Sequence, residues 1–304
     1  MSKEFRKQPL VSIVMNCHNG ESYLSESIKS VLSQTYENWE LIFWDNLSTD
    51  KSKEILKGFS DNRIKYFKSK NFTTLYEARN LAIKETNGEF ISFLDVDDWW
   101  VPEKLEVQVK QFKNNNDVGL VYSKYFLYNQ KNKKKKLAPN KKLPQGYITE
   151  QLLENFIVSI LTAMFKKELL QKFNLYFNSK YNIIGDFDFF FRFSKKVKFL
   201  CVQKPLAFYR VHGSNLSIKN LNEEIQELEH WTKEQIYSEK QNVNNLNKIN
   251  NLILYKKIFM NISENQRFLA LKKIFKYPNN YLKLKLFILL ISPFSLLRRF
   301  NLLN

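Results

Sequence analysis

Three carboxylates within four residues stand out in this 304-residue chain. Asp95, Asp97 and Asp98 follow an apolar run that begins at Phe90 and is typical of a buried strand. Two carboxylates about 4 Å apart repel by roughly 4 kcal/mol at an effective dielectric constant near 20, so this crowding calls for a cation, a proton or strong donors. A divalent metal that carries a phosphate would satisfy it. A turn that caps the helix after Pro102 is the alternative, because Asp is common at such positions.

Two other polar segments follow predicted strands earlier in the chain. Residues 16–19 follow the apolar run Leu10–Met15, and Asp45 follows the run Trp39–Trp44. Apolar periodicity predicts a third strand at residues 64–67, and helices around residues 24–32, 55–59 and 75–86. Strands and helices that alternate through short connections predict a doubly wound, mostly parallel α/β sheet of the Rossmann-like class. Because ligands bind at the carboxyl ends of strands in such sheets, the three polar clusters should converge on one crevice.

In the second half of the core, the predicted helices and strands alternate less regularly. The predicted elements are a helix after Pro102, a strand at 120–128, a mainly helical stretch at 146–173 with a strand-like portion near 156–165, a helix that opens with Ile183–Asp188 and runs to about Lys195, and strands at 197–202 and 206–209. Asn87-Gly88 is expected to end the preceding helix with a left-handed cap. Asp186 and Asp188 point to different sides of their helix, so one should face the crevice while the other caps or pairs.

The composition is ordinary except for its charge, which is +18. Such a charge indicates an anionic partner such as a nucleotide, phospholipid or nucleic acid, or a genome-wide drift towards lysine. Lys131–Lys142 holds seven lysines and no acid. We expect a solvated hairpin tip there rather than a nucleic-acid patch, because no aromatic residues are interleaved for base stacking.

The end of the chain has a different character. No side-chain carboxylate follows Glu264, whereas lysines and arginines continue to Arg299. The apolar segment Leu286–Leu297 is shorter than the roughly 20 residues that span a bilayer, and Pro293 interrupts it. It therefore suits a segment lying in an anionic membrane interface, and a terminal helix docked on the core is the alternative.

The cysteines and the N-terminus bear on the compartment. Cys17 and Cys201 are far apart and without other cysteines, so neither a disulfide framework nor a cysteine zinc site is expected. Residues 1–9 are polar and lead directly into a strand, unlike a secretory signal. These features predict a protein of the reducing cytoplasm.

Several short motifs occur in a fixed order along the chain. They are Val11–Met15 with Asn19, Ser30–Tyr36, Trp39–Ile42 with Asp45 and Ser48–Asp50, Ala78–Asn80, Asp95–Asp98, Gly185–Asp188 through Arg192, and Tyr209–His212 with Asn215 and Ser217. Together they resemble the inverting glycosyltransferases of family 2, of the bacterial cell-surface glycan type. The resemblance covers roughly residues 9–218. It implies a GT-A fold with a nucleotide-sugar-binding catalytic domain at 1–218, and a helical, basic, membrane-associating region at 219–304.

The resemblance also implies roles for individual residues. The donor nucleotide sugar would be bound by Asn16, His18, Asn19, Asp45, Arg79 and Asp95. Mn²⁺ or Mg²⁺ would be held by Asp97, with Asp98 and His212 as further candidate ligands, and would neutralise the charge that develops on the leaving diphosphate. Asp186 would be the general base that takes the proton of the acceptor hydroxyl.

Three positions depart from the family pattern. The family often has Pro where Asn16 stands, Asp where Asn46 stands, and Glu where Gly185 stands. The first two departures are expected to alter nucleotide contacts, and the third to affect the pKa of Asp186.

The predicted function is transfer of a hexosyl or N-acetylhexosaminyl group from a nucleotide-diphosphate sugar, with UDP as the expected nucleotide, to a hydroxyl of a glycan or lipid-linked acceptor. The enzyme would work on the cytoplasmic face of the cell membrane, held by residues 265–304 on its anionic surface. Two alternatives remain open at this stage: a basic nucleic-acid-binding protein without catalysis, and a catalytically silent nucleotide-sugar-binding partner of another transferase.

Overall fold

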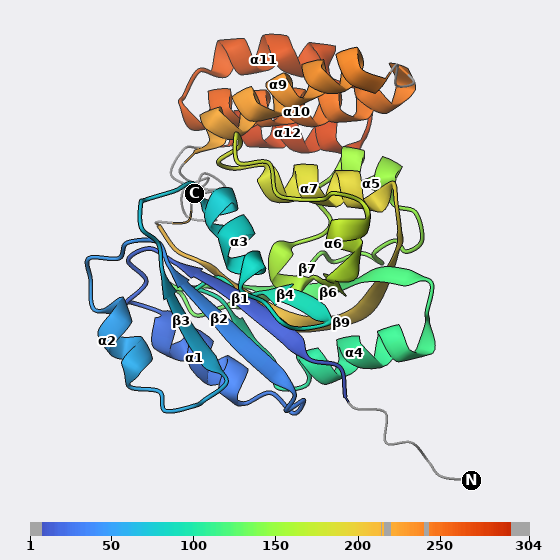
Figure 1. The fold of residues 1–304 in the computed structure, drawn as a ribbon. Helices are drawn as coiled ribbons and strands as arrows, with labels where there is room; N and C mark the ends of the chain where they lie inside the picture. The colour runs from blue at the N-terminus through green and yellow to red at the C-terminus, as the bar shows by residue number, and fades with distance from the viewer. Residues whose placement is uncertain (1–7, 214, 216–219, 240–242, 293–304) are drawn as a thin grey trace. The chain divides into compact units, whose positions relative to one another are not determined.

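A computed structural model describes residues 8–213, 215, 220–239 and 243–292 (Figure 1). The chain divides into two compact units. The first holds the residues up to Leu152 together with Phe156–Val211, and the second holds Leu153–Asn155 together with the chain from His212 onward. The boundary predicted between residues 218 and 219 falls within residues 216–219, which lie outside the described part.

One mixed sheet forms the centre of the first unit. Its strands are β1 Val11–Cys17, β2 Trp39–Asp45, β3 Ile64–Lys68, β4 Phe90–Phe93, β5 Trp99–Trp100, β6 Val118–Asn129, β7 Lys135–Ala138, β8 Met164–Lys166 and β9 Lys198–Val211. The order is β3-β2-β1-β4-β8-β6-β9-β5, and β7 pairs with β6. The longest pairings, β1 with β2 and β6 with β9, are parallel, whereas β8 is antiparallel to both of its neighbours. The predicted α/β class with a mostly parallel sheet is therefore confirmed.

Helices cover both faces of this sheet, as Figure 1 shows. They are α1 Leu24–Leu32, α2 Ser52–Lys57, α3 Leu75–Lys84, α4 Lys104–Asn114, α5 Thr149–Glu154, α6 Glu168–Lys172 and α7 Gly185–Ser194, with a short 3-10 turn at Ile160–Thr162. Side chains alternate along β1, so Ile13 packs in the core with α1, α2 and α4, whereas Val14 packs in the core with α3, α6 and α7. The strand is buried along its whole length, as expected for a strand covered on both faces.

The register of the parallel strands brings their carboxyl ends together. Cys17 lies opposite Asp45, and the N–H of Asn46 donates to the carbonyl of Cys17 at 2.7 Å. On the other side of β1, the N–H of Leu94 donates to the carbonyl of Val14 at 3.0 Å. The polar segments after β1, β2 and β4 therefore begin next to one another.

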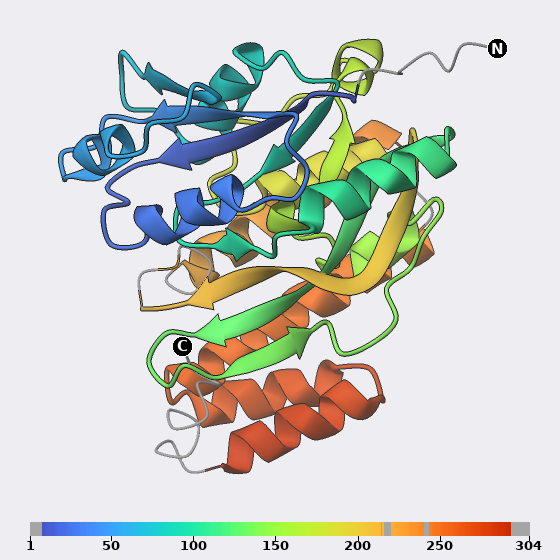
Figure 2. The same cartoon turned by 90° about the horizontal axis from the view of Figure 1, so that it is seen from below.

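Two sequence predictions are wrong. The helix before Gly88 ends at Lys84, and no left-handed cap forms at Gly88. This glycine instead permits a close approach, because a Cβ atom there would lie 2.6 Å from the backbone nitrogen of Ser12. The two strands predicted at 197–202 and 206–209 are one long strand, β9, whose pairing with β6 shifts register near Pro205 instead of breaking (Figure 2).

The lysine-rich segment forms the predicted hairpin. β6 and β7 pair antiparallel from Tyr125 opposite Ala138 to Tyr128 opposite Lys135 (Figure 2). Residues 130–136 at the tip are exposed.

The second unit is helical, as predicted for the C-terminal region. It contains α9 Leu221–Glu239, α10 Val243–Ser263, α11 Arg267–Lys276 and α12 Tyr281–Ile291. Ile258 of α10, Ile274 of α11 and Leu286 of α12 are fully buried in one cluster. Of the helices described, none is long and apolar enough to cross a membrane. The predicted apolar segment at 286–297 extends past residue 292, where the described part ends.

Candidate active site

The loops after β1 and β2 are joined by side-chain hydrogen bonds. Asn19 adopts a left-handed backbone with φ of 57°, which asparagine tolerates better than most residues. Its Oδ1 accepts from the N–H of Thr49 at 2.8 Å, and its own N–H donates to Oγ of Ser48 at 3.1 Å. Nδ1 of His18 lies 3.0 Å from the carbonyl of Asn46. The sequence prediction that residues 16–19 meet the segment after β2 is confirmed.

Asp45 is buried at the end of β2 and its carboxylate is already hydrogen-bonded. Oδ1 accepts from the N–H of Ser48 and Oδ2 accepts from the hydroxyl of Tyr66, both at 2.7 Å. Burial and the neighbouring Asp45 raise the pKa of Tyr66, so this phenol keeps its proton and acts as the donor. Each carboxylate oxygen has a second lone pair, and a hydrogen-bond donor of a ligand would have to bind there.

Asn46 explains one departure from the family pattern. Its Nδ2 donates to the carbonyl of Thr73 at 2.9 Å, and its Oδ1 accepts from the N–H of Thr73 at 3.2 Å. Only an amide can donate and accept in this way, because an ionised carboxylate is an acceptor alone. Asn46 therefore ties the loop before α3 to the end of β2.

Arg79 is a buried cation beneath the acidic turn. Only 2% of the residue is exposed, and its Nη2 donates to Oδ1 and Oδ2 of Asp95 at 2.9 and 3.2 Å. The rings of Tyr76, Phe93 and Phe177 surround the guanidinium, with centroids 5.4 to 5.8 Å from Cζ. Asp95 is partly exposed, so this ion pair connects the interior to the edge of the sheet.

Asp97 and Asp98 have different environments. Asp98 is 1% exposed, and its Oδ1 accepts from the backbone N–H of Arg210 at 2.8 Å. Burial, reinforced by the charges of Asp97 and Asp95, raises the pKa of Asp98 well above its usual range, which favours the neutral form. Asp97 is partly exposed, and its backbone carbonyl accepts from Nε of Arg210 at 2.7 Å.

Asp186 and Asp188 separate as the helical spacing predicted. Asp188 is buried and forms an ion pair with Arg192 at 2.8 Å, one turn further along α7. Asp186 is partly exposed, and its Oδ1 accepts from the N–H of Phe187 at 2.8 Å and lies 3.4 Å from the hydroxyl of Tyr76. Burial raises the pKa of Asp186, while the nearby Arg79 guanidinium opposes the rise.

Sequence reasoning missed two residues at this edge. Tyr76 lies one turn before Arg79 on α3, and its spacing of three residues could have placed it on the same side of the helix. Arg210 lies within a motif that the sequence singled out, but no role was assigned to its side chain. Neither contact was visible without the tertiary structure, because Tyr76 meets Asp186 and Arg210 meets Asp97 across more than a hundred residues.

The candidate metal ligands do not form a complete cage within one unit. His212 follows β9 and belongs to the second unit, where its N–H donates to Oδ1 of Asn215 at 2.6 Å. Across the described ranges, no three or more His, Cys, Asp or Glu side chains are arranged to hold a metal ion. The roles of Asp97, Asp98 and His212 towards a metal therefore stay predictions.

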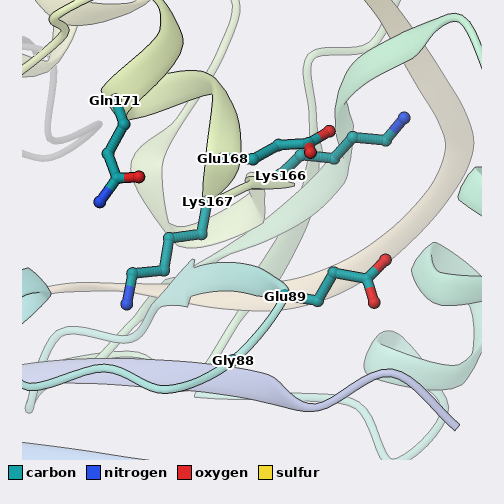
Figure 3. A pocket seen from close by; sticks show the side chains of 6 residues that line it. All are labelled: Gly88, Glu89, Lys166, Lys167, Glu168 and Gln171. Carbon is teal, nitrogen blue, oxygen red and sulfur yellow. The ribbon is translucent and has the colours of Figure 1, made fainter. Parts of the chain in front are cut away.

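A pocket of about 420 Å³ lies away from this edge (Figure 3). It is lined by Gly88 and Glu89, which precede β4, by Lys166 at the end of β8, by Lys167, and by Glu168 and Gln171 of α6. The ammonium groups of its two lysines donate to the backbone carbonyls of Asn116 and Thr86. It is at the amino end of β4, opposite to Asp95, and is not the crevice that the sequence predicted.

The sheet topology, with an acidic turn after β4 and Asp186 at the start of α7, defines a glycosyltransferase of the GT-A class. The chain belongs to glycosyltransferase family 2, whose model matches residues 12–188. The glucosyltransferase WfgD of Escherichia coli, named as UDP-Glc:alpha-D-GlcNAc-diphosphoundecaprenol beta-1,3-glucosyltransferase, is 38% identical over 171 residues, which are 56% of this chain and 66% of WfgD. This chain thus matches slightly less than two thirds of that relative. An uncharacterized glycosyltransferase of Haemophilus influenzae is 32% identical, over 81% of this chain and 95% of its own length.

Solved structures share the fold at low sequence identity. Residues 1–349 of S. aureus TarS in complex with UDP-GlcNAc superpose with a TM-score of 0.61 at 16% identity, covering 88% of this chain and 81% of that one. The mannosyltransferase PcManGT from Pyrobaculum calidifontis, in complex with GDP-Man and Mn²⁺, gives a TM-score of 0.58 at 15% identity, covering 78% and 66%. These likenesses confirm the predicted GT-A fold.

Proposed function

We propose that this glycosyltransferase moves a sugar from a UDP-sugar to a hydroxyl of a glycan or lipid-linked glycan, with inversion at the anomeric carbon. The observation that carries the proposal is the position of Arg79, whose buried guanidinium binds Asp95 and also acts electrostatically on Asp186. One cation thereby links a carboxylate on the expected donor side to a carboxylate on the expected acceptor side. The names of WfgD and of the TarS complex, which include a UDP-sugar, support UDP as the nucleotide.

The donor site would lie at the carboxyl ends of β1 and β2. His18, Asn19 and Asp45 would face the nucleoside, with Asp45 accepting a hydrogen bond through its remaining lone pairs. Among the described residues, Nδ2 of Asn16 and Nε of Arg79 are buried without a hydrogen-bond partner. A buried donor of this kind is destabilising unless it is paired, so an oxygen-rich diphosphate is a fitting ligand for both groups.

A divalent ion fits the acidic turn when it is shared with the donor. Mg²⁺ in particular is commonly held by one or two carboxylates together with substrate phosphates, so a three-residue protein cage is not required. Asp97, which is partly exposed, would hold the ion, whereas buried Asp98 would keep the turn in place through Arg210. His212 remains a candidate ligand. The ion, Mn²⁺ or Mg²⁺, would supply Lewis-acid stabilisation of the leaving diphosphate.

Asp186 would act as the general base in a single displacement. The acceptor oxygen attacks the anomeric carbon from the face opposite the diphosphate, the bond from that carbon to the diphosphate oxygen breaks, and Asp186 takes the hydroxyl proton. Burial brings the pKa of Asp186 upward from the usual range of an aspartate, closer to the working pH, where a base is more effective.

The second unit would hold the enzyme on an anionic membrane surface facing the cytoplasm. Tyr281, Leu284, Ile288 and Ile291 are exposed along α12 at spacings of three and four residues, which places them on one stripe. Exposed Phe268 and Phe275 of α11, and lysines 272, 276 and 285, belong to the same unit. Apolar side chains combined with lysines suit the headgroup region of a bilayer.

Binding to vesicles tests this part of the proposal. The full chain should sediment with vesicles containing phosphatidylglycerol and not with neutral phosphatidylcholine vesicles. The double variant Leu284→Ser/Ile288→Ser should lose this binding, while Tyr147→Ser, which removes an exposed aromatic of the first unit, should retain it. Equal binding by all three proteins would refute the membrane role of this stripe.

Transfer from UDP-sugars tests the catalytic part. With Mn²⁺ and a lipid-linked GlcNAc acceptor, we expect one UDP-sugar to be consumed with formation of a product of inverted configuration. Asp186→Asn should lower kcat by about 100-fold or more while UDP affinity stays close to that of the parent. Parent-like turnover of this variant would refute Asp186 as the base, and donor binding without transfer would favour a silent partner of another transferase.

A further inference from the structure

Tyr76 makes three contacts with the chain where α7 begins. Its hydroxyl donates to the carbonyl of Ile183 at 2.8 Å and lies 3.4 Å from Oδ1 of Asp186. Between them, its ring lies against Gly185, where a Cβ atom would be only 2.5 Å from Cδ2 of the ring. One side chain of α3 therefore fixes the backbone before Asp186, the residue next to it and one of its carboxylate oxygens.

Tyr76 is itself held rigidly. It is 3% exposed, its ring stacks on Phe177 at 5.8 Å, and the guanidinium of Arg79 lies 5.4 Å from its centroid. Burial raises the pKa of Tyr76 well above its usual value, so the hydroxyl stays protonated, and its single proton is shared between the Ile183 carbonyl at 2.8 Å and Oδ1 of Asp186 at 3.4 Å. A rigid donor at this point favours one orientation of the carboxylate.

The remaining contacts of Asp186 are consistent with a fixed carboxylate. Oδ1 is also bound by the N–H of Phe187. Within the described residues, no group donates a hydrogen bond to Oδ2. Because Oδ1 accepts from the N–H of Phe187 and lies 3.4 Å from the Tyr76 hydroxyl, Oδ2 is the oxygen that remains for a substrate hydroxyl.

We propose that Tyr76 is a positioning residue for the catalytic carboxylate of Asp186, and that position 185 is glycine because the ring of Tyr76 occupies the space of any side chain there. This inference rests on the proposed function, in which Asp186 is the base. It assigns to α3, which also carries Arg79, the task of orienting the base on α7. From the sequence alone, the only expected effect of Gly185 was the loss of the carboxylate that the family often has at this position.

The first test is Tyr76→Phe, which keeps the ring and removes the hydroxyl. We expect kcat to fall by about tenfold, which corresponds to the loss of one modest hydrogen bond, with little change in the KM for the UDP-sugar. The acidic limb of the kcat profile should move to higher pH, because the hydroxyl favours the ionised form of Asp186. The other groups acting on that carboxylate, Arg79, Asp95 and the N–H of Phe187, remain in the variant.

Tyr122→Phe is the matched control for structural damage. Tyr122 is also fully buried and donates to a backbone carbonyl, that of Pro144, at 2.5 Å. This control should lower the melting temperature as Tyr76→Phe does, yet leave kcat and its pH profile at parent values. If Tyr76→Phe has parent kcat and an unmoved acidic limb, the proposal is wrong, whatever its melting temperature.

A double-mutant cycle tests the role of Gly185. Gly185→Ala should lower kcat strongly in the parent, because the methyl group displaces the Tyr76 ring. In the Tyr76→Leu background the same substitution should lower kcat much less, since the ring is gone. Equal effects in both backgrounds would refute the steric link. An active Asp186→Asn enzyme would instead overturn the proposed base itself, so the two failures are distinguishable.

Discussion

The backbone N–H of Arg210 donates to Oδ1 of the buried Asp98 at 2.8 Å, and this bond joins β9 to the acidic turn after β4. The side chain of the same arginine reaches the carbonyl of Asp97, Oε1 of Gln130 and the carboxylate of Glu26. Arg210 is 3% exposed, and its buried guanidinium forms an ion pair with Glu26, whose side chain is exposed. The turn that carries the candidate metal ligand is thus held by a strand that the sequence places more than a hundred residues away.

Asp97 and Asp98 should respond differently to the same substitution. Asp97→Asn should weaken Mn²⁺-dependent UDP binding by about tenfold or more, because one anionic ligand is lost. Asp98→Asn keeps an oxygen for the Arg210 N–H, so UDP affinity and transfer should remain within about threefold of the parent. Calorimetric titration of UDP with and without Mn²⁺ measures both. A reversed pattern would make Asp98 the ligand.

Arg210→Ala should destabilise the first unit and weaken the acidic turn. Loss of bonds from a charged donor is expected to lower the free energy of unfolding by about 2–4 kcal/mol, and the KM for Mn²⁺ should rise. Urea unfolding and metal-dependent kinetics give the two quantities. Lys198→Ala, which removes a solvent-exposed ion pair with Asp117, is the control and should leave the free energy of unfolding close to that of the parent. If both variants behave alike, Arg210 does not hold the turn.

Lys104 should make stability depend on pH in the alkaline range. It is fully buried, with Nζ bonded to Ser92 and Gln108 and lying 3.8 Å from the Trp100 ring centroid. Burial lowers the pKa of Lys104 well below 10.5, so the folded chain favours the neutral amine. As the pH falls below about 10.4, the unfolded chain takes up a proton that the folded chain does not, and stability is lost until the folded pKa is reached.

Replacing Lys104 by methionine should remove this dependence. As the pH falls below about 10.4, the parent should lose unfolding free energy relative to Lys104→Met, at no more than about 1.4 kcal/mol per pH unit. Denaturant unfolding at three pH values measures the slopes, with exposed Lys110→Met as the control. Parallel slopes for parent and Lys104→Met would contradict a neutral lysine in the core.

Asn46→Asp, which restores the residue common in the family, should be destabilising in this chain. The carboxylate cannot donate to the carbonyl of Thr73, and it would add a negative charge beside buried Asp45. The free energy of unfolding should fall by about 1–3 kcal/mol at pH 7, and by less near pH 4, where the new carboxyl is partly protonated. An unchanged melting temperature at pH 7 would show that the paired amide contributes little.

The sequence by itself determined the order of the elements in the parallel half of the sheet. β1, β2 and β4 are buried along their whole length and the helices have one apolar side, so local periodicity already specifies these elements. The separation of Asp186 from Asp188 was also predictable, because helical spacing fixes which side chains share a face. The structural role of Gly88 was not predictable, because the sequence does not distinguish a glycine that permits close packing from a glycine that caps a helix.

Only the tertiary structure decided which polar groups meet. In the folded chain Asp98 is buried beside Arg210, whereas Asp97 is partly exposed. The local sequence cannot predict this difference, because the two residues are adjacent and identical and the position of β9 decides it. The tertiary structure also placed Tyr76 in the space above Gly185. Such contacts join segments that are distant in the chain. The burial and charge pairing of residues in the candidate active site therefore depend on how the sheet and helices pack.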